Sequence, residues 1–256
     1  MDNNKRNIFQ DIAEFWAFQL NNEIYLRKHP DVVRGSKEYF DIIIEARRKF
    51  IYYFPSIVNY LKGGSSRDLL EVGCGMGTDA LMLAREGFSV TGLDITPAHL
   101  VLAEKLFSLY NEHGTFVEGN AETLSFPDNS FGCAYSFGVL HHTPDTGKAI
   151  REIHRVLKPK GRAVIMLYHK LSLNNFIHWV LRSGFENAKR GADSPITYRF
   201  SIKEVQNMCS AFNSCDIGIE YLFGAGWGKA YDLMPKPIYF FLSKKIGWHL
   251  VVYLEK

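Results

Sequence analysis

Three glycines within five residues, Gly73, Gly75 and Gly77, stand between an aliphatic run and a segment with helical spacing in the stretch EVGCGMGTD. Glycine lets the backbone turn sharply after a strand and approach a bound molecule without a Cβ in the way. A helix that begins near Thr78 then points its free N-terminal amides at that molecule. This unit of strand, loop and helix indicates an α/β fold with a ligand at the loop.

The alternation continues along the chain. Short aliphatic runs are followed by segments with helical periodicity, which indicates βαβ units and a parallel sheet with helices on both faces. Parallel sheets bind ligands at the carboxyl ends of their strands. The predicted strands are 69–72, 89–93, 115–118, 132–137 and 162–168, and the predicted helices between them are 78–86, 97–113 and 146–157.

The segments on either side of this core have a different pattern. Helical spacing over 8–20 and 37–61 predicts two helices ahead of it, and Ser201 with Glu204 three residues on is a capping-box pattern that begins a later helix. Two further strands are expected at 216–223 and 248–254. We therefore divide the chain into an N-terminal helical segment or lid (1–64), a ligand-binding core (65–170), and a C-terminal part with lid insertions and the last two strands (171–256).

The ligand is expected to contain a ribose. Asp94 lies 21 positions beyond Gly73, at the end of the next aliphatic run, where a carboxylate can accept from both ribose hydroxyls. The dinucleotide fingerprint requires its third glycine where this chain has Thr78. Acidic Glu71 and Asp79 beside the loop suit a cationic ligand better than a pyrophosphate.

At these residues the chain resembles the class I, Rossmann-like S-adenosylmethionine-dependent methyltransferases. LLEVGCGMGTD is similar to the first motif of that family, VTGLDIT to its second, GNAETLSFPDNSF to its third, and SFGVLHHTPD with EIHRVLKPKGRAVIMLYHK to the remainder, over residues 67–170. The run Leu-His-His-Thr-Pro-Asp is similar to that of small-molecule methyltransferases. The resemblance implies a seven-stranded, mostly parallel sheet, S-adenosylmethionine as cofactor with S-adenosylhomocysteine as product, and in-line methyl transfer to a small, partly apolar acceptor.

The resemblance also assigns site residues by position. Those facing the methionine part and the ribose are Glu71, Gly73, Cys74, Gly75, Gly77, Asp79 and Asp94, and those near the adenine and the sulfonium are Ile95, Asn120, Ala121, Glu122, Phe137 and Gly138. Three of these have a structural alternative: Cys74 is a small residue tolerated in the loop, Asp79 compensates a helix dipole, and a similar alternative applies to Glu71, although an acidic group in an apolar strand is harder to explain that way. Asn120 departs from the Asp usual in the family. Its carboxamide oxygen still accepts a hydrogen bond from the adenine amino group, so weakened selectivity is expected.

Candidates for the chemistry follow the fourth and fifth predicted strands. His141 and His142 come after the fourth strand, and neutral imidazole is a competent base near pH 7. The alternative is that one of them caps the helix that begins near Pro144. Tyr168 ends the fifth strand and is a candidate substrate contact, with an aromatic plug between sheet and helix as its alternative.

Aromatic residues outside the core are candidates for a lid over the acceptor. They are Trp16, Phe18, Trp227, Tyr231 and Tyr239, and core packing is the alternative for each. The stretch MPKPIYFFLSKK mixes aromatic residues with lysines, which is compatible with weak contact with a membrane surface.

Composition limits the kinds of partner and ligand that the protein is expected to bind. A formal charge of +3 without a basic block disfavours nucleic-acid binding, and the four cysteines have no metal-ligand spacing, so no metal is expected. No run predicts a signal peptide or a stable membrane insertion, and a cytoplasmic monomer or homodimer is expected. Two other functions stay open: an NAD(P)-dependent oxidoreductase, against which Thr78 counts, and a non-catalytic S-adenosylmethionine-binding protein.

Overall fold

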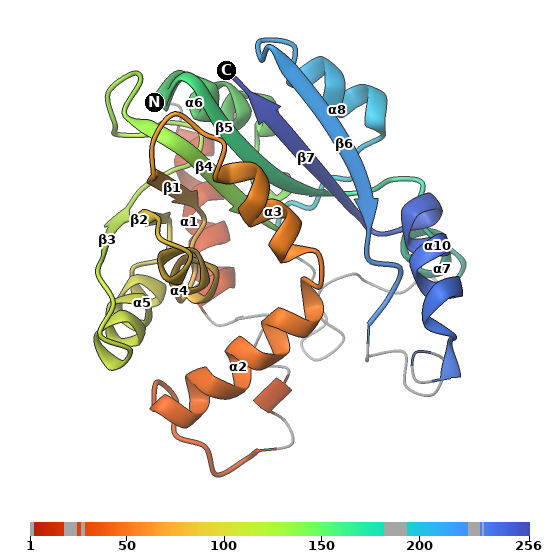
Figure 1. Cartoon of the computed structure of the whole chain (residues 1–256), viewed down its shortest axis with the longest axis horizontal. Coiled ribbons are helices and arrows are strands. Elements are labelled where there is room, and N and C mark those ends of the chain that lie inside the picture. Colours follow the sequence, from red (N-terminus) through yellow and green to blue (C-terminus); the bar gives the residue numbers. More distant parts are fainter. Residues whose placement is uncertain (1–2, 18–24, 27–28, 182–193, 225–230, 232) are drawn as a thin grey trace.

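A seven-stranded sheet runs through the molecule in the order β3-β2-β1-β4-β5-β7-β6 (Figure 1). The computed structural model describes residues 3–17, 25–26, 29–181, 194–224, 231 and 233–256. The strands are β1 (Asp68–Val72), β2 (Ser89–Asp94), β3 (Gly114–Glu118), β4 (Phe131–Phe137), β5 (Leu157–Tyr168), β6 (Ser214–Glu220) and β7 (His249–Glu255). The predicted Rossmann-like α/β fold is confirmed.

The strand directions bring the carboxyl ends of five strands to one edge. Strands β1 to β5 pair in parallel, whereas β7 lies between β5 and β6 and pairs antiparallel with both. The carboxyl ends of β1 to β5 therefore lie at the same edge. Because β7 runs the other way, its first residue, His249, pairs there with Tyr168, the last residue of β5.

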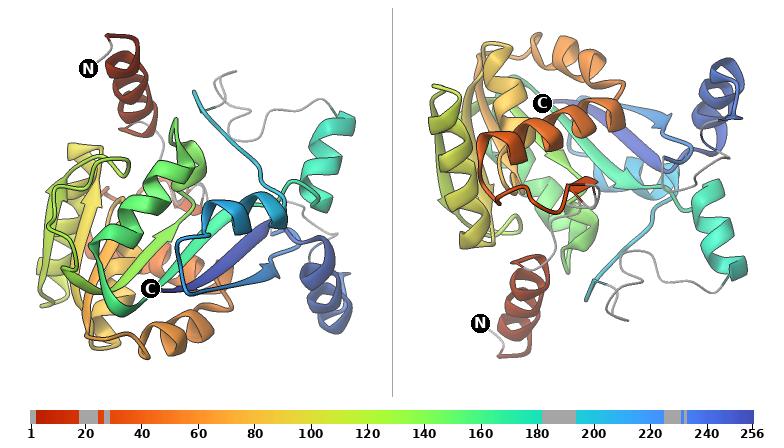
Figure 2. Two further views of the ribbon diagram at one scale, coloured as in Figure 1. Left: turned by 90° about the horizontal axis from the view of Figure 1, so that it is seen from above. Right: turned by 90° about the horizontal axis from the view of Figure 1, so that it is seen from below.

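Helices cover both faces of the sheet (Figure 2). One face packs against α2 (Lys37–Phe50), α3 (Phe54–Leu61), α4 (Thr78–Arg85) and α5 (Pro97–Leu109), and the other against α6 (Thr146–Val156) and α8 (Ile202–Met208). Successive residues of β4 serve opposite faces, because side chains alternate along a strand. Tyr135 and Phe137 point into the first layer and Ala134 into the second.

The remaining helices are attached to the ends of the core. These are α1 (Asn3–Ala17), the short 3₁₀ helix η2 (Leu140–His142), α7 (Leu173–Leu181) and α10 (Lys236–Ile246). Helix α7 follows β5 directly, and α10 precedes β7, so both are inserted at the carboxyl edge of β5. Within the part of the chain that the structure describes, no helix is long and apolar enough to cross a membrane.

Several predicted boundaries differ from the structure by a few residues, and two of the differences have a local cause. The segment 37–61 forms two helices rather than one, because Pro55, in the first turn of α3, has no N–H to donate to the Ile51 carbonyl and its ring would clash with that carbonyl in a continuous helix. Strand β5 begins at Leu157 instead of 162, because Leu157 pairs with Phe131 before a register shift in β4. The predicted capping box of Ser201 and Glu204 is present at the start of α8.

Candidate functional site

The glycine loop joins β1 to α4 at the carboxyl edge of the sheet. Gly73, Gly75 and Gly77 all have positive φ, at 77°, 53° and 79°. A Cβ added to Gly73 would lie 2.3 Å from a methyl carbon of Val139, whereas a Cβ added to Gly75 would have no described atom within 4 Å. The loop therefore leaves open space beside Gly75, where a ligand can approach the backbone.

Asp94 lies at the end of β2 and faces this loop. Its Oδ2 accepts a hydrogen bond from the Gly75 amide at 2.8 Å, and its Oδ1 accepts one from the Thr96 amide at 2.9 Å. An ionised carboxylate has about four lone-pair sites. Asp94 thus holds the loop in place and keeps acceptor capacity for ligand hydroxyls.

Glu71 is a buried carboxyl group in β1, just before the loop. Among the described residues, its Oε2 has no hydrogen-bond partner. Burial, and secondly the negative charge of Asp79, raise the pKa of Glu71 well above its usual range. A buried carboxyl with an unsatisfied oxygen is costly on its own, and a cationic ligand group would offset that cost.

Asp79 lies in the first turn of α4 and is held by residues from other elements. Arg47 of α2 donates to both of its oxygens, from Nε at 2.7 Å and from Nη2 at 2.6 Å. The Tyr135 hydroxyl donates to Oδ2 at 2.9 Å. Asp79 therefore anchors α2 to the core, a role that its position in the sequence did not predict.

The residues assigned to the adenine edge follow β2 and β3. Ile95 is half-buried, and Ala121 is buried. The side-chain oxygen of Asn120 accepts from the Glu122 amide at 2.8 Å, and Oε1 of Glu122 accepts from the Asp145 amide at 2.7 Å. Glu122 thus holds the start of α6. The Asn120 side-chain oxygen, which is expected to accept a hydrogen bond from adenine, already accepts one from the Glu122 amide.

Phe137 and Gly138 end β4 beside Arg47. The Arg47 guanidinium carbon lies 4.5 Å from the centroid of the Phe137 ring, in a cation–π contact. Gly138 has φ of 78° and is half-buried. The Arg47 guanidinium therefore holds the ring of Phe137 in place, and the backbone leaves the strand direction at Gly138.

The three predicted catalytic candidates lie together. The ring centroids of His141 and Tyr168 are 3.7 Å apart, and those of His141 and His142 are 4.2 Å apart. Tyr168 in turn packs on Trp248, with centroids 4.4 Å apart. Both histidines lie in η2, so neither is the N-cap of α6, where Asp145 accepts the Lys148 amide instead.

The two histidines differ in their surroundings. Burial, followed by the neighbouring His142, lowers the pKa of His141 well below its usual value, and neither of its ring nitrogens has a described hydrogen-bond partner. Nδ1 of His142 lies 2.8 Å from the carbonyl oxygen of Ile196. A carbonyl only accepts, so Nδ1 carries the proton and Nε2 is the basic nitrogen of neutral His142.

Two residues at this edge were missed by the sequence analysis. His249, the first residue of β7, is fully buried, with Nδ1 2.6 Å from the Tyr53 hydroxyl and its ring 5.5 Å from that of Phe137. Arg47 lies on the buried face of α2, between Ile43 and Phe50. The sequence did hold one signal for Arg47, because this charged residue stands at a position where the helical spacing calls for an apolar one. No comparable signal existed for His249.

The stability of the protein should depend on His249 in mild acid. Burial, and secondly Arg47, lower the pKa of His249 well below its usual value, so the folded state keeps it neutral while the unfolded chain takes up a proton below about pH 6.5. Its contribution is therefore present above that pH and is lost as the pH falls. Between pH 7 and 5 this loss amounts to up to about 2 kcal/mol.

Urea unfolding of the wild type and of His249→Gln at both pH values measures that loss. Glu71 has the opposite effect on the pH dependence of stability, because its raised pKa makes the folded state relatively more stable as the pH falls. Comparison with the variant removes this contribution. Equal losses of stability in the two proteins would show that His249 is not the titrating group, and His113→Ala, at an exposed position, serves as the control.

Some predicted lid residues contact the site, and others lie outside the described residues. Trp16 of α1 packs on His142 with ring centroids 5.0 Å apart, and its carbonyl oxygen lies 3.0 Å from Nε2 of His99. The Tyr239 hydroxyl donates to the Phe223 carbonyl at 2.9 Å, beside Tyr231, so both belong to a small apolar cluster. Phe18 and Trp227 fall outside the described ranges.

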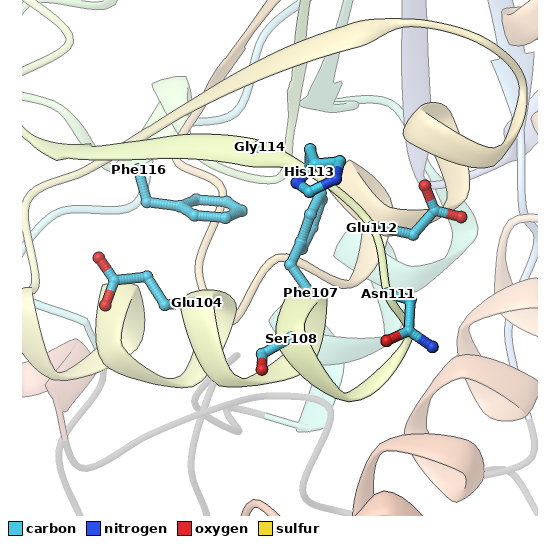
Figure 3. Close-up of a pocket in the computed structure, with 8 residues that line it drawn as sticks. All are labelled: Glu104, Phe107, Ser108, Asn111, Glu112, His113, Gly114 and Phe116. Atoms are coloured by element: carbon cyan, nitrogen blue, oxygen red, sulfur yellow. The ribbon is translucent and has the colours of Figure 1, made fainter.

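One other hollow lies outside this site. A surface hollow of about 530 Å³ is lined by residues of α5 and the start of β3, including Phe107 and Phe116 (Figure 3). It lies at the amino end of β3, opposite the glycine loop.

Burial raises the pKa of the Cys74 thiol well above its usual value, so the thiol is protonated and a poor nucleophile. Among the described residues, no three His, Cys, Asp or Glu side chains are grouped as metal ligands.

Comparison with protein families gives one match over the core. The model of the family described as "Methyltransferase domain" matches residues 70–165. This range includes the glycine loop, Asp94 and the two histidines of η2.

Curated relatives match over the same region. The chain is 42% identical over 100 residues to the ubiquinone/menaquinone biosynthesis C-methyltransferase UbiE of Nitrobacter hamburgensis, covering 37% of this chain and 39% of that protein. It is 31% identical over 162 residues to a demethylmenaquinone methyltransferase of Chlorobaculum tepidum, covering 63% and 58%. It is 30% identical over 151 residues to phosphoethanolamine N-methyltransferase 2 of Caenorhabditis elegans, covering 56% and 35%. The chain thus spans between about a third and three fifths of these relatives.

Solved structures share the fold at low identity. A protein of Pyrococcus horikoshii has a TM-score of 0.60 and 16% identity, over 91% of this chain and 98% of that one. An S-adenosylmethionine-dependent methyltransferase of Mesorhizobium loti has a TM-score of 0.57 and 18% identity, over 79% and 97%.

Proposed function

We propose that this chain, whose residues 70–165 form a class I methyltransferase domain, is an enzyme that transfers the methyl group of S-adenosylmethionine to a small-molecule acceptor. One observation carries the proposal furthest. The space beside Gly75 is open, the Asp94 carboxylate accepts from the Gly75 amide, and Glu71, two residues before the glycine loop, has a buried oxygen without a described partner. A ligand with ribose hydroxyls and a cationic end suits both groups.

The residues of the chain fit that cofactor. Asp94 would accept from the ribose hydroxyls, and Glu71 would lie toward the ammonium of the methionine end, with Gly73 to Gly77 beside it. Ile95, Asn120 and Ala121 would border the adenine, and Phe137 and Gly138 the sulfonium. When bound, the cofactor supplies an activated methyl group, so the protein mainly has to orient the acceptor and exclude water.

We assign proton removal from the acceptor to His142. Its Nδ1 is fixed by the Ile196 carbonyl, which leaves Nε2 as a basic nitrogen, whereas the low pKa of His141 makes that residue a weaker base. Tyr168 stays a candidate for contact with the acceptor, because its ring lies on His141.

The histidine variants test this assignment. His142→Ala is expected to lower kcat about 10²-fold to 10⁴-fold with little change in cofactor affinity, because the base acts only in the transition state. His141→Ala is expected to have a smaller effect on kcat. His113→Ala on the surface is the matched control. Full activity in His142→Ala and in the double variant would remove histidine from the mechanism.

The first experiment for the proposed function is isothermal titration calorimetry with S-adenosylmethionine, S-adenosylhomocysteine and NADH in parallel. Binding of the first two without NADH supports the cofactor assignment, and binding of NADH alone would favour an oxidoreductase. A radiolabelled methyl-transfer screen then separates an enzyme from a non-catalytic binding protein. Transfer to no member of a broad acceptor set would favour the latter.

The acceptor and the partners are further proposals. The relatives named above methylate quinone precursors or phosphoethanolamine, so their names support a small molecule but divide between carbon and nitrogen as the methylated atom. We propose a partly apolar acceptor, because aromatic rings gather around Phe137 and Tyr168. Three properties stay predictions. Cell fractionation would check the cytoplasmic location, light scattering the monomeric or homodimeric state, and a gel-shift assay the lack of nucleic-acid binding.

A further inference from the structure

Helices α7 and α10 carry exposed apolar side chains at one end of the molecule. The two helices lie at the same end in all three ribbon views, beyond β6 and away from α5 (Figures 1 and 2). We use the name α7/α10 face for the exposed residues of the two helices, which lie apart from each other in Figure 2: Phe176, Trp179, Val180, Ile238, Phe240 and Phe241. Trp179 is 75% exposed and Phe241 64%, which is unusual for such large side chains.

The exposed residues follow helical spacing. Phe176, Trp179 and Val180 are three and four residues apart on α7, and the rings of the first two are 6.1 Å apart. Ile238 and Phe241 are likewise three residues apart on α10. Residues at this spacing share one side of a helix, so each helix presents an apolar side to solvent.

The charges on these helices are all positive. The sequences of α7, LNNFIHWVL, and of α10, KPIYFFLSKKI, contain no Asp or Glu. Lys236, Lys244 and Lys245 of α10 are exposed. Lys244 pairs with Glu220, and the Nζ of Lys236 lies 4.6 Å from the Tyr231 ring. Lys245 lies seven residues beyond Ile238, on the same side as Phe241.

We infer that the α7/α10 face binds the surface of a lipid bilayer that contains anionic headgroups. Exposed Trp and Phe side chains enter the boundary between headgroups and acyl chains, while lysines beside them pair with lipid phosphates. A second copy of the chain is a poorer occupant, because a two-fold contact would place the lysines of the face against their own copies.

The position of the face has a consequence for access to the site. Helix α7 follows Tyr168 by way of four residues, and α10 leads into β7, which begins at His249. The same end of the molecule therefore carries both the bilayer contact and the rim of the candidate acceptor site. The inference of lipid binding itself does not depend on the proposed methyl transfer.

Cosedimentation with vesicles tests the inference. We expect the protein to sediment with phosphatidylcholine vesicles that contain about one third phosphatidylglycerol, and to do so at least tenfold less with phosphatidylcholine alone, because each lysine near the surface contributes on the order of 1 kcal/mol. High salt should weaken the binding. Absence of binding to both vesicles, or equal binding to both, would overturn the inference.

Variants locate the contact. Trp179→Asp/Phe241→Asp and Lys245→Glu should each lower vesicle binding at least tenfold while the circular dichroism spectrum stays unchanged, because these side chains are exposed. Val101→Asp, at an equally exposed apolar position on α5, is the matched control and should bind like the wild type. Wild-type binding by the Trp179→Asp/Phe241→Asp variant would overturn the assignment to this face.

Two readouts separate lipid contact from self-association. Brominated phosphatidylcholine in the anionic vesicles should quench tryptophan fluorescence in the wild type, and Trp179→Phe should remove most of that quenching. Light scattering without vesicles should give the same mass for the wild type and for the double Asp variant. A lower mass for that variant, together with no vesicle binding by the wild type, would mean that the face joins two copies of the chain.

Discussion

Asp94→Ala is expected to lower the affinity for S-adenosylhomocysteine at least about 100-fold. Two hydrogen bonds to a charged carboxylate contribute about 1.5 to 3 kcal/mol each, and 1.4 kcal/mol corresponds to a factor of ten. The substitution also removes the acceptors for the Gly75 and Thr96 amides, so the glycine loop loses its support at the same time. Isothermal titration calorimetry measures the affinity directly.

A control on the same sheet distinguishes this loss from a general effect of removing a carboxylate. Asp68→Ala changes an exposed residue at the opposite end of β1, where it pairs with Lys158, and should leave the affinity unchanged. Asp94→Asn keeps one oxygen acceptor and should fall between the wild type and Asp94→Ala. Wild-type affinity in Asp94→Ala would refute the assignment of the site.

Arg47→Met is expected to destabilise the protein by about 3 to 5 kcal/mol. Removing one partner of a buried ion pair leaves the other charge without compensation, and that is the cost usually observed. Among the residues that the structure describes, Asp79 would then keep only the Tyr135 hydroxyl as a side-chain donor. Urea unfolding at pH 7 measures the change, with the slope of the transition checked for two-state behaviour.

A double variant tests the physical cause. Arg47→Met/Asp79→Asn removes both charges and should recover a large part of the lost stability, which a variant that merely disturbed packing would not do. Lys49→Met, on the solvent side of the same helix, should cost little, because its ion pair with Glu45 is exposed. Equal destabilisation of the single and double variants would mean that the pair is not what holds α2 in place.

Much of the fold followed from the sequence because periodicity is a local property. The strand and helix runs between 68 and 168 could be read from aliphatic spacing, and the capping box at Ser201 from residue types. The order of β6 and β7 could be expected only from the family resemblance, because pairing between strands far apart leaves no local trace. The break at 51–53 was missed, although Pro55 was a signal for it.

The candidate site could be predicted only in part, because only some of its residues lie in local sequence motifs. Residues next to the glycine loop and at strand ends, such as Asp94 and His142, are found by their place in a local motif. Arg47 and His249 come from segments about 200 residues apart and meet only in the folded molecule. The local bonds of Asn120 and Glu122 were likewise invisible in the sequence, because they depend on the turn that the chain adopts there.

The placement of β7 between β5 and β6 also sets an order for folding during synthesis. A nascent chain that has left the ribosome only as far as β6 contains every parallel strand but lacks the partner of both β5 and β6. The edge of β5, which includes the apolar run from Ala163 to Leu167, then stays unpaired, and such edges favour aggregation. Closure of the sheet has to wait until residues 249–255 have left the ribosome, so we expect the nascent chain to need protection by chaperones up to that point.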